Sequence, residues 1–339
     1  MNTATHDSPP QETATMLAIV QDSYGDARDV LHLEETAQPV IGDGEVLLRV
    51  RAAGVDRGVW HLMTGLPYPV RLAGYGIRAP KTRVRGREVA GQVDAVGKDV
   101  TTFRVGDEVF GIAEGALAGY ACAQPGKLAR RPDNLSAVQA AAVSVSALTA
   151  LQAVRDHGHV QAGQKVLVIG ASGGVGTFAV QIAKAYGADV TGVCSTTKTD
   201  LVQSIGADHV IDYTRADFAD GAHRYDVIID TGGNRQLRQL RSALTPRGTL
   251  VIVGGETGGR WLGGFDRSLR APVLSRFVTQ ELATFMCSEN ASDLYVLTEL
   301  ITSGKVTPVI DKTYPLRQAP DAIRYMQDGH ARGKVVITI

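Results

Sequence analysis

The sequence predicts an α/β protein in which a doubly wound parallel sheet is inserted into a β-rich domain. Residues 165–187 read as a buried strand, a glycine-rich turn and a helix in succession. Strands and helices then alternate up to about residue 304, whereas residues 16–135 and 305–339 read mostly as short strands. Such alternation is typical of a parallel sheet that is covered by helices on both faces.

The first strand of the parallel sheet is predicted at residues 165–170, a short apolar run. Helical spacing of apolar residues follows from 175 to 186, and Gly187 is placed to end the helix. A dinucleotide needs a tight glycine turn at such a junction, with free N–H groups at the helix start. The residues expected to bind its pyrophosphate are Ala171, Ser172, Gly173, Gly174, Val175 and Gly176. The alternative is an ordinary strand–turn–helix whose glycines serve packing alone.

Further strands and helices of the parallel-sheet domain are predicted from the same alternation. Strands are predicted at residues 189–194, 209–213, 225–230 and 248–254, and helices at 137–154, 200–205 and 293–303. Ser136 is a plausible N-cap for the helix at 137–154, which we expect to be interrupted. Ligands bind beyond the carboxyl ends of parallel strands, so Gly232 and Gly254 are expected to contact the cofactor.

The rest of the chain is predicted to form the β-rich domain. Residues 45–50 alternate as a strand, and residues 105–111 read as a tight turn that enters one. The expected divisions are a mobile tail (1–15), the β-rich domain (16–135 and 305–339, with strands at 306–310, 312–315 and 333–339) and the nucleotide-binding domain (136–304). The sequence leaves residues 255–285 open, as a flap over the site or as part of an oligomer contact.

Composition excludes several classes of function. The 339 residues carry 35 Lys and Arg against 35 Asp and Glu, so neither a broad nucleic-acid surface nor a membrane surface is indicated. No apolar run is long enough to span a bilayer, and residues 1–15 lack the features of a signal peptide. Three widely spaced cysteines form neither a disulfide framework nor a metal cluster. A cytoplasmic protein without nucleic-acid or membrane partners is therefore expected.

Several motifs, in this order, carry a family resemblance: residues 146–150 (SALTA), 168–176 (VIGASGGVG), 206–213 (GADHVIDY) and 333–337 (GKVVI). The chain resembles the medium-chain dehydrogenase/reductase superfamily, in its zinc-independent, quinone oxidoreductase-like branch, over nearly all of its length after the tail. The resemblance implies a GroES-like β domain, a Rossmann domain, and an active site in the cleft between them. It also implies a homo-oligomer, for which we expect a homodimer.

Zinc is not expected in this chain. In the zinc-dependent relatives a Cys lies where this sequence has Asp56, and the His of their Gly-His-Glu motif corresponds to Arg87. Zinc sites in proteins are built from thiolate, imidazole and carboxylate ligands, and a guanidinium is hostile to a metal. His61 is interpreted as a polar side chain rather than a ligand.

The residues after the second strand of the parallel sheet favour NADPH over NADH. NAD-specific sites place an Asp or Glu there to bind the ribose hydroxyls, whereas residues 194–198 contain no acid. Hydroxyls and an ammonium suit a 2′-phosphate, which makes Ser195, Thr196 and Lys198 candidates. The resemblance adds Tyr213, at the end of the next strand. Lys198 has an alternative interpretation as a solvated lysine at a helix start.

The resemblance implies NADPH-dependent reduction of a quinone or an α,β-unsaturated carbonyl. Such acceptors already withdraw electrons from the carbon that receives hydride, so no metal is needed. Thr149 corresponds to the family residue that touches nicotinamide, although a helix hydroxyl often bonds its own backbone instead. Asp56 and Tyr68 are candidates to line the cleft, with Tyr68 as a hydrogen-bond or proton donor or as a packing residue. Near the C-terminus, Lys334 and Arg332 are expected to approach the cofactor.

Two other functions stay open at this point. One is an NADP-dependent alcohol dehydrogenase or carbonyl reductase, and the other is a non-catalytic, crystallin-like NADPH-binding protein. The sequence does not specify the acceptor, because side chains from two domains would shape its pocket.

Overall fold

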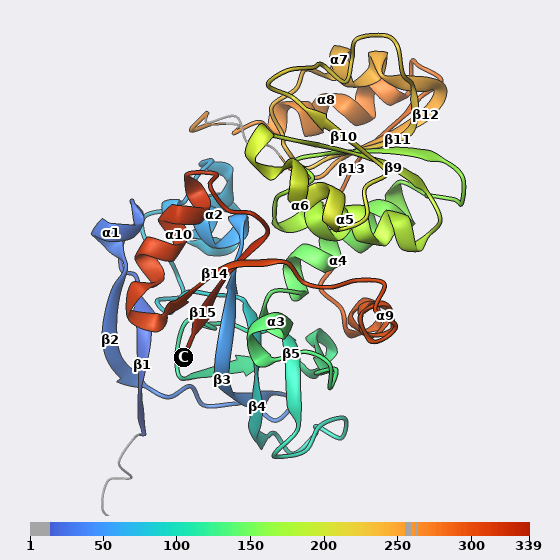
Figure 1. Cartoon of the computed structure of the whole chain (residues 1–339). Coiled ribbons are helices and arrows are strands. Elements are labelled where there is room, and N and C mark those ends of the chain that lie inside the picture. Colours follow the sequence, from blue (N-terminus) through green and yellow to red (C-terminus); the bar gives the residue numbers. More distant parts are fainter. Residues whose placement is uncertain (1–13, 255–258, 262) are drawn as a thin grey trace, which may run out of the picture.

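The computed structural model describes residues 14–254, 259–261 and 263–339, which form two lobes joined through α4 (Figure 1). We call them the β-rich lobe and the parallel-sheet lobe. Most of the predicted tail, residues 1–13, and residues 255–258 and 262 of the segment left open by the sequence lie outside the described residues.

The β-rich lobe is built on a seven-stranded sheet with the order β14-β15-β3-β4-β5-β7, in which β6 also pairs with β3. Its strands are β3 (Val46–Val55), β4 (Glu88–Val96), β5 (Glu108–Ile112), β6 (Tyr120–Ala123), β7 (Leu128–Arg130), β14 (Ile310–Pro315) and β15 (Lys334–Thr338). A separate antiparallel pair is formed by β1 (Thr15–Val20) and β2 (His32–Ala37). Because β15 pairs with β3, the end of the chain rejoins the first lobe, as predicted.

One predicted strand of this lobe is wrong. Residues 306–309 have no strand partner, and β14 begins only at Ile310. The reason is that Val306 packs into the core of the parallel-sheet lobe and Thr307 is bonded on both sides by the Gln181 side chain. These residues are therefore a crossing between lobes, and their apolar character serves packing.

Helices of the β-rich lobe are more numerous than the sequence indicated. They are α1 (Ala27–Val30), α2 (Arg57–Thr64), α10 (Ala319–Gln327), a π-turn η1 (Arg71–Tyr75) and the 3₁₀ turns η2 (Pro125–Lys127) and η5 (Leu316–Gln318). The side chain of Asp56 caps α2 by accepting a bond of 3.1 Å from Val59 N. This cap fixes where the strand β3 turns into a helix.

The parallel-sheet lobe has the predicted doubly wound topology, with the strand order β10-β9-β8-β11-β12-β13 and every neighbouring pair parallel. Its strands are β8 (Lys165–Ile169), β9 (Asp189–Cys194), β10 (His209–Asp212), β11 (Tyr225–Asp230), β12 (Leu244–Ile252) and β13 (Glu281–Thr284). The order reverses between β8 and β11, and such a switch point is where these sheets bind ligands.

The helices of the second half agree with the predicted ones and add three. They are α3 (Ala137–Ala141), α4 (Ser144–Gln152), the π-turn η3 (Ala153–His157), α5 (Gly174–Ala185), the 3₁₀ turn η4 (Thr196–Lys198), α6 (Thr199–Ser204), α7 (Leu237–Ser242), α8 (Phe265–Ser275) and α9 (Ala291–Thr302). Ser136 caps α3 in a capping box with Gln139, and the helix is broken before α4, as expected.

The break between α3 and α4 marks the passage between the lobes. α3 packs against β3 and β4, whereas α4 packs against α5 and α9. The chain therefore crosses near residue 143, slightly later than the sequence suggested. One hydrophobic cluster runs through this junction and joins Ala90 and Phe110 of the β-rich lobe to Val166 and Phe178 of the other. The two lobes thus share a core, which fixes the residues that face each other across the junction.

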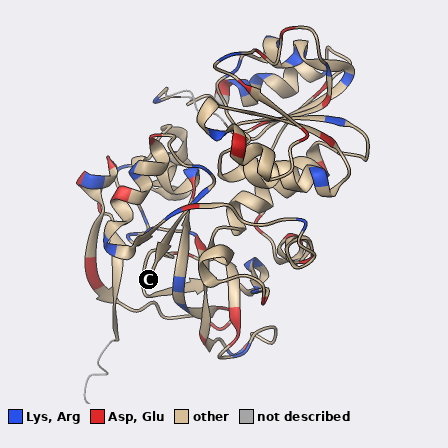
Figure 2. Cartoon of the chain, viewed as in Figure 1, with Lys and Arg blue, Asp and Glu red and all other residues tan. Residues whose placement is uncertain are grey.

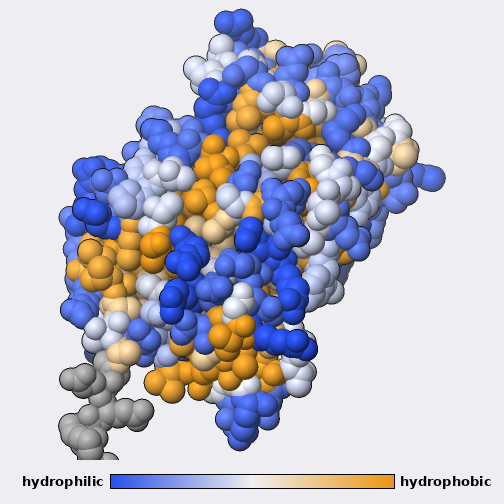
Figure 3. Space-filling model, turned by 60° about the horizontal axis from the view of Figure 1, so that its bottom comes forward, coloured by the Kyte–Doolittle hydropathy of each residue, from blue (hydrophilic) through white to orange (hydrophobic). Residues whose placement is uncertain are grey.

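The surface carries no dominant feature in the views shown. Lys and Arg are interspersed with Asp and Glu over both lobes (Figure 2), and apolar residues form separate patches among polar ones (Figure 3). Among the described residues, no helix combines the length and the apolar character that crossing a bilayer requires.

Candidate cofactor and acceptor site

The turn between β8 and α5 has the geometry that a dinucleotide's pyrophosphate requires. Gly170 has a φ of 79°, which glycine adopts without strain. A Cβ on Gly176 would clash with the carbonyl oxygen of Gly170, so only glycine lets the helix pack here. α5 begins at Gly174 without a side-chain cap in the described part of the chain, which leaves its first N–H groups for an anion. A Cβ on Gly173 would meet only the Gly170 oxygen, at 3.4 Å, so this side of the turn is open.

The other predicted residues of the turn lie in the same place. Ala171 and Ser172 are buried, and the Ala171 N–H donates to the Val193 carbonyl at 3.0 Å. Val175 is half-buried and packs against the core. The structure therefore brings all six predicted pyrophosphate residues together, and the glycine turn fits a dinucleotide.

The C-terminal strand supports this turn from behind. Gly333 N donates a bond of 2.9 Å to the Ser172 carbonyl. A Cβ on Gly174 would lie 3.1 Å from Cδ of Lys334, so the lysine stem fills the space beside that glycine. Lys334 is 2% exposed, and its ammonium binds the Glu88 carboxylate and, at 3.0 Å, Ser146 Oγ. Lys334 therefore lies next to the turn, but its charge is directed to Glu88.

Glu88 is the partner that sequence reasoning missed. It is fully buried at the start of β4, and its Oε1 accepts bonds from Val145 N (2.8 Å) and Ser146 N (3.4 Å) at the start of α4. Burial raises the pKa of Glu88 to about 7, although the ammonium of Lys334 opposes the rise. This one carboxylate connects β4, α4 and β15. Its only sequence signal was the Gly-Arg-Glu motif at residues 86–88.

Beyond β9 lies the corner where the sequence analysis places the adenosine end of the cofactor. Ser195 and Thr196 follow the strand, and Lys198 Nζ donates to the carbonyls of Gly329 and Ala331, each at 2.9 Å. Partial burial lowers the pKa of Lys198. These bonds tie the lysine to the loop before β15, so it is neither free nor simply solvated.

The same corner holds further charged groups. Arg332 pairs with Asp200 at 2.8 Å on the exposed side of η4. Tyr213 is 51% exposed just after β10, and its amide donates to the carbonyl of Cys194 at 3.1 Å. The acid Asp212 was not noticed in the sequence. It accepts a bond of 2.6 Å from Thr196 Oγ1, and this bond is the main cause of its lowered pKa.

The predicted glycines at the ends of β11 and β12 are also at the carboxyl edge of the sheet. A buried ion pair that sequence reasoning missed holds their loops: Arg267 donates to Asp230 at 2.9 Å and to the Gly254 carbonyl at 3.1 Å. Asp230 Oδ1 also accepts a bond of 3.1 Å from Gly233 N, beside Gly232. The two loops are thus fixed relative to each other at the place where a bound cofactor would continue.

Asp56 and Arg87, at the positions of the zinc ligands in relatives, make different interactions. Asp56 Oδ1 caps α2, while its buried Oδ2 has no hydrogen-bond partner among the described residues. Arg87 forms an ion pair with Glu289, which also accepts a bond of 2.9 Å from Lys127 Nζ. The described residues contain no group of three or more His, Cys, Asp or Glu side chains that is arranged to hold a metal.

Thr149 lies beside the loop that follows β13. Its hydroxyl donates to the Val145 carbonyl at 2.7 Å, the local bond anticipated for a helix threonine. The thiol of Cys287 interacts with the same hydroxyl, and burial raises the pKa of this thiol. Gln152 anchors the loop by bonds to Ser288 of 2.8 and 2.9 Å. Sequence reasoning passed over Cys287, because its neighbours come from distant segments.

Tyr68 contacts the segment that the sequence left open. Its amide donates to the Arg260 carbonyl at 2.9 Å, and its ring meets Trp261 edge-on at 5.2 Å. The guanidinium of Arg71 lies over the same ring. Residues 260–261 therefore touch the β-rich lobe, whereas the later part of the segment forms α8 and the edge strand β13. The contacts of Tyr68 are thus with Arg71 and with residues 260–261.

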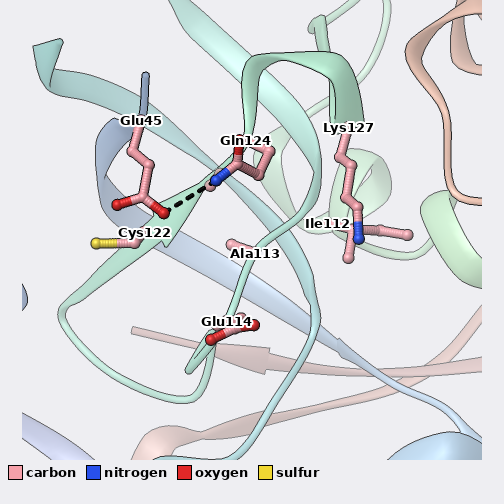
Figure 4. Close-up of a pocket in the computed structure, with 8 residues that line it drawn as sticks. Glu45, Ile112, Ala113, Glu114, Cys122, Gln124 and Lys127 are labelled. Carbon is pink, nitrogen blue, oxygen red and sulfur yellow. Dashed lines mark hydrogen bonds between the residues drawn. The ribbon is translucent and has the colours of Figure 1, made fainter. Parts of the chain in front are cut away.

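A small pocket of about 120 Å³ lies elsewhere, on the β-rich lobe (Figure 4). Its lining residues are Glu45, Ile112, Ala113, Glu114, Cys122, Ala123, Gln124 and Lys127. Burial raises the pKa of Cys122 to about 11, so this thiol stays protonated and is a poor nucleophile. The pocket contains none of the predicted site residues.

Comparison with known proteins agrees with this architecture. Family profiles described as "Alcohol dehydrogenase GroES-like domain" and "Zinc-binding dehydrogenase" match residues 42–147 and 205–337. The mouse mitochondrial NAD(P)H oxidoreductase RTN4IP1 is 33% identical, with 96% of this chain and 90% of that protein covered. The tomato (Solanum lycopersicum) 2-methylene-furan-3-one reductase is 33% identical, with 96% and 81% covered. The structure of the quinone oxidoreductase from Coxiella burnetii is 28% identical, with a TM-score of 0.82 and 96% and 100% covered.

Substitution of Gly176 by alanine tests the glycine turn. The added Cβ meets the Gly170 carbonyl, so we expect NADPH affinity to fall at least about tenfold and stability to fall by about 1–3 kcal/mol, as for other overpacked sites. Fluorescence titration and urea unfolding measure the two effects. Gly126→Ala is the matched control, because nothing lies within 4 Å of its Cβ position. Unchanged affinity in Gly176→Ala would show that the turn does not hold the cofactor.

Substitution of Lys334 by methionine tests the buried ion pair through its pH dependence. Because the folded-state pKa of Glu88, about 7, exceeds its ordinary value of 4.5, the stability that Glu88 contributes is complete below about 4.5 and is lost as the pH rises through 7. Removing the ammonium raises that pKa further. We expect Lys334→Met to lose about 3–5 kcal/mol at pH 8 and clearly less at pH 5.5, by urea unfolding. Lys184→Met, which removes an exposed pair with Asp208, is the control. Equal losses at both pH values would contradict the account.

Proposed function

We propose that this chain, which belongs to the quinone oxidoreductase-like branch of the medium-chain dehydrogenase/reductase superfamily, is an NADPH-dependent reductase of quinones or α,β-unsaturated carbonyls. The family makes it an oxidoreductase with a nicotinamide cofactor. The relatives named above include an NAD(P)H oxidoreductase, a quinone oxidoreductase and an enone reductase, and they support this acceptor class.

The preference for NADPH rests on one observation, the corner beyond β9. Ser195, Thr196 and Lys198 stand where NAD-specific sites carry an acid, and no carboxylate occurs among residues 194–198. Of the nearby acids, Asp200 is paired with Arg332, and Asp212 accepts bonds from threonine hydroxyls. A phosphate monoester placed there would meet the Ser195 hydroxyl and the remaining N–H of the Lys198 ammonium, with Tyr213 at its margin. The Thr196 hydroxyl, which now donates to Asp212, would have to turn to donate to the phosphate.

The proposed acceptor class is supported by the side chains near the end of β13, at the opposite end of the sheet from the corner beyond β9. The reduced nicotinamide supplies a hydride, with both electrons, to the acceptor carbon, and the charge that develops on the acceptor oxygen is quenched by a proton from water. Arg87 is a cation and no metal ligand, so this site favours the reduction of acceptors that are already electron-poor over the oxidation of unactivated alcohols. Thr149 is proposed to contact the nicotinamide ring, and Asp56 and Tyr68 to line the acceptor side.

Two further proposals concern the setting of the enzyme. β13 is an edge strand whose outer side has no partner within the described chain, and it gives a place where two copies can pair in a homodimer. All three cysteines are free, which supports a reducing compartment such as the cytoplasm.

NADPH oxidation with 1,4-benzoquinone and with 2-cyclohexen-1-one tests the function directly. We expect turnover with at least one of them, unchanged after treatment with EDTA. A protein that turns over no member of a broad quinone and enone panel would contradict the proposal. Tight NADPH binding without any turnover would favour a binding protein instead.

Substitution of Lys198 by alanine tests the cofactor preference. A lost charge-assisted bond is worth about 1.5–3 kcal/mol, so NADPH affinity should fall about 10- to 100-fold. NADH affinity should change less than about twofold, because NADH has no 2′-phosphate. Fluorescence titrations of both cofactors provide the measurement, with Lys184→Ala on α5 as the matched control. An equal loss for both cofactors would indicate a structural role for Lys198.

A further inference from the structure

We propose that Arg87 binds the oxygen of the acceptor and stabilises the negative charge that develops there during hydride transfer. This assignment rests on the proposed function and specifies which side chain replaces the metal of zinc-dependent relatives.

The location follows from strand order. β13 runs parallel to its neighbours, so the chain leaving it emerges at the same edge as Gly232 and Gly254. That chain carries Glu289, and Arg87 is bound to it. A dinucleotide with its adenosine beyond β9 and its pyrophosphate at the β8 turn extends its other end toward β11 and β12. Arg87 is therefore at the nicotinamide end, opposite the phosphate corner.

The guanidinium is held before any ligand arrives. Glu289 binds it from one side, and the loop carrying Glu289 is anchored to α4 through Gln152 and Ser288. Lys127 approaches the same carboxylate, so two cations share one anion. A charge-stabilising group acts best when it is oriented in advance and partly shielded from water. The Arg87 side chain, 29% exposed, is shielded but still accessible.

The chain also leaves room beside the guanidinium. Residue 58 is glycine, and a Cβ there would lie 2.7 Å from Asp56 Oδ1 and 3.7 Å from Arg87 Nη1. The clash at this position would be with the Asp56 carboxylate, whereas the Cβ would only touch the guanidinium, so the glycine keeps the space between the two groups free. The neighbouring Asp56 Oδ2 is buried and has no partner in the described part of the chain, which is a costly state for a carboxylate oxygen. A ligand that carries a hydroxyl or a protonated oxygen would satisfy it.

The competing interpretation is that Arg87 only ties the two lobes together through Glu289. If the pair were purely structural, removing Arg87 would lower the stability of the protein and would lower its affinity for all ligands by a similar factor. If Arg87 binds the oxygen, removing it would lower the affinity most for ligands whose oxygen carries the most negative charge. The experiment therefore compares the binding of the neutral and the ionised form of one probe.

The probe is 4-nitrophenol, whose phenolate resembles an enolate oxygen and absorbs at a different wavelength from the phenol. It is titrated into the NADP⁺ complexes of the wild type, Arg87→Met, Arg87→Lys and Arg130→Met. We expect the wild type to bind the phenolate at least about tenfold more tightly than Arg87→Met, with a larger ionised fraction at the same pH. Arg87→Lys should recover part of this difference. Arg130→Met removes an exposed pair with Asp107 on the same lobe and should resemble the wild type.

Turnover of 2-cyclohexen-1-one gives the second readout. We expect Arg87→Met to lower kcat/KM by about 10²–10³-fold, as does removal of other oxyanion donors, while NADPH affinity changes less than about twofold. If the wild type turns over no acceptor, the proposed function fails, yet the phenolate titration still tests Arg87. The same phenolate affinity and ionised fraction in wild type and Arg87→Met would overturn the inference.

Discussion

The ion pair between Glu88 and Lys334 is the interaction on which the site depends. Its members are 246 residues apart, and it joins β4, β15 and the start of α4 at the junction of the lobes. Burying two charges is expensive, and bonds from Val145, Ser146 and the lysine itself satisfy most of the lone pairs and protons involved. Because the stem of Lys334 also packs beside Gly174, the pair sets the glycine turn against the β-rich lobe.

From this junction the site extends in two directions along the carboxyl edge of the parallel sheet. Toward β9 lie Lys198 and Arg332, which are both bonded to neighbouring segments. Toward β13 lie Arg87 and Glu289, which come from different lobes. A dinucleotide that spans the edge would meet positive charge at both ends and backbone N–H groups in the middle. In the proposed assignment the two lobes thus supply both cofactor binding and charge stabilisation.

The sequence predicted five of the six strands of the parallel sheet, because each of those five is a local apolar run followed by a turn signal, as at 225–230. The sixth strand, β13, lies in the segment that the sequence left open. Prediction from the sequence failed where contacts between distant segments determine the local structure. Residues 306–309 read as a strand but cross between the lobes. The helix α2 was missed for another reason, because its cap from Asp56 is a local signal that the sequence analysis did not use. The glycine turn was predictable because its chemistry is local. The Asp230–Arg267 and Glu88–Lys334 pairs were not, because no periodicity marks partners that meet only after folding.

The most direct test of the account is the fate of hydrogen in the reduced product. The protein is supplied with NADPH stereospecifically deuterated at nicotinamide C4, in each of the two configurations, and with 2-cyclohexen-1-one in ordinary water. The account predicts that one of the two cofactors delivers its deuterium to the β-carbon and that the α-carbon takes hydrogen from solvent. Product that forms without deuterium from either cofactor would contradict direct hydride transfer between a bound nicotinamide and the acceptor.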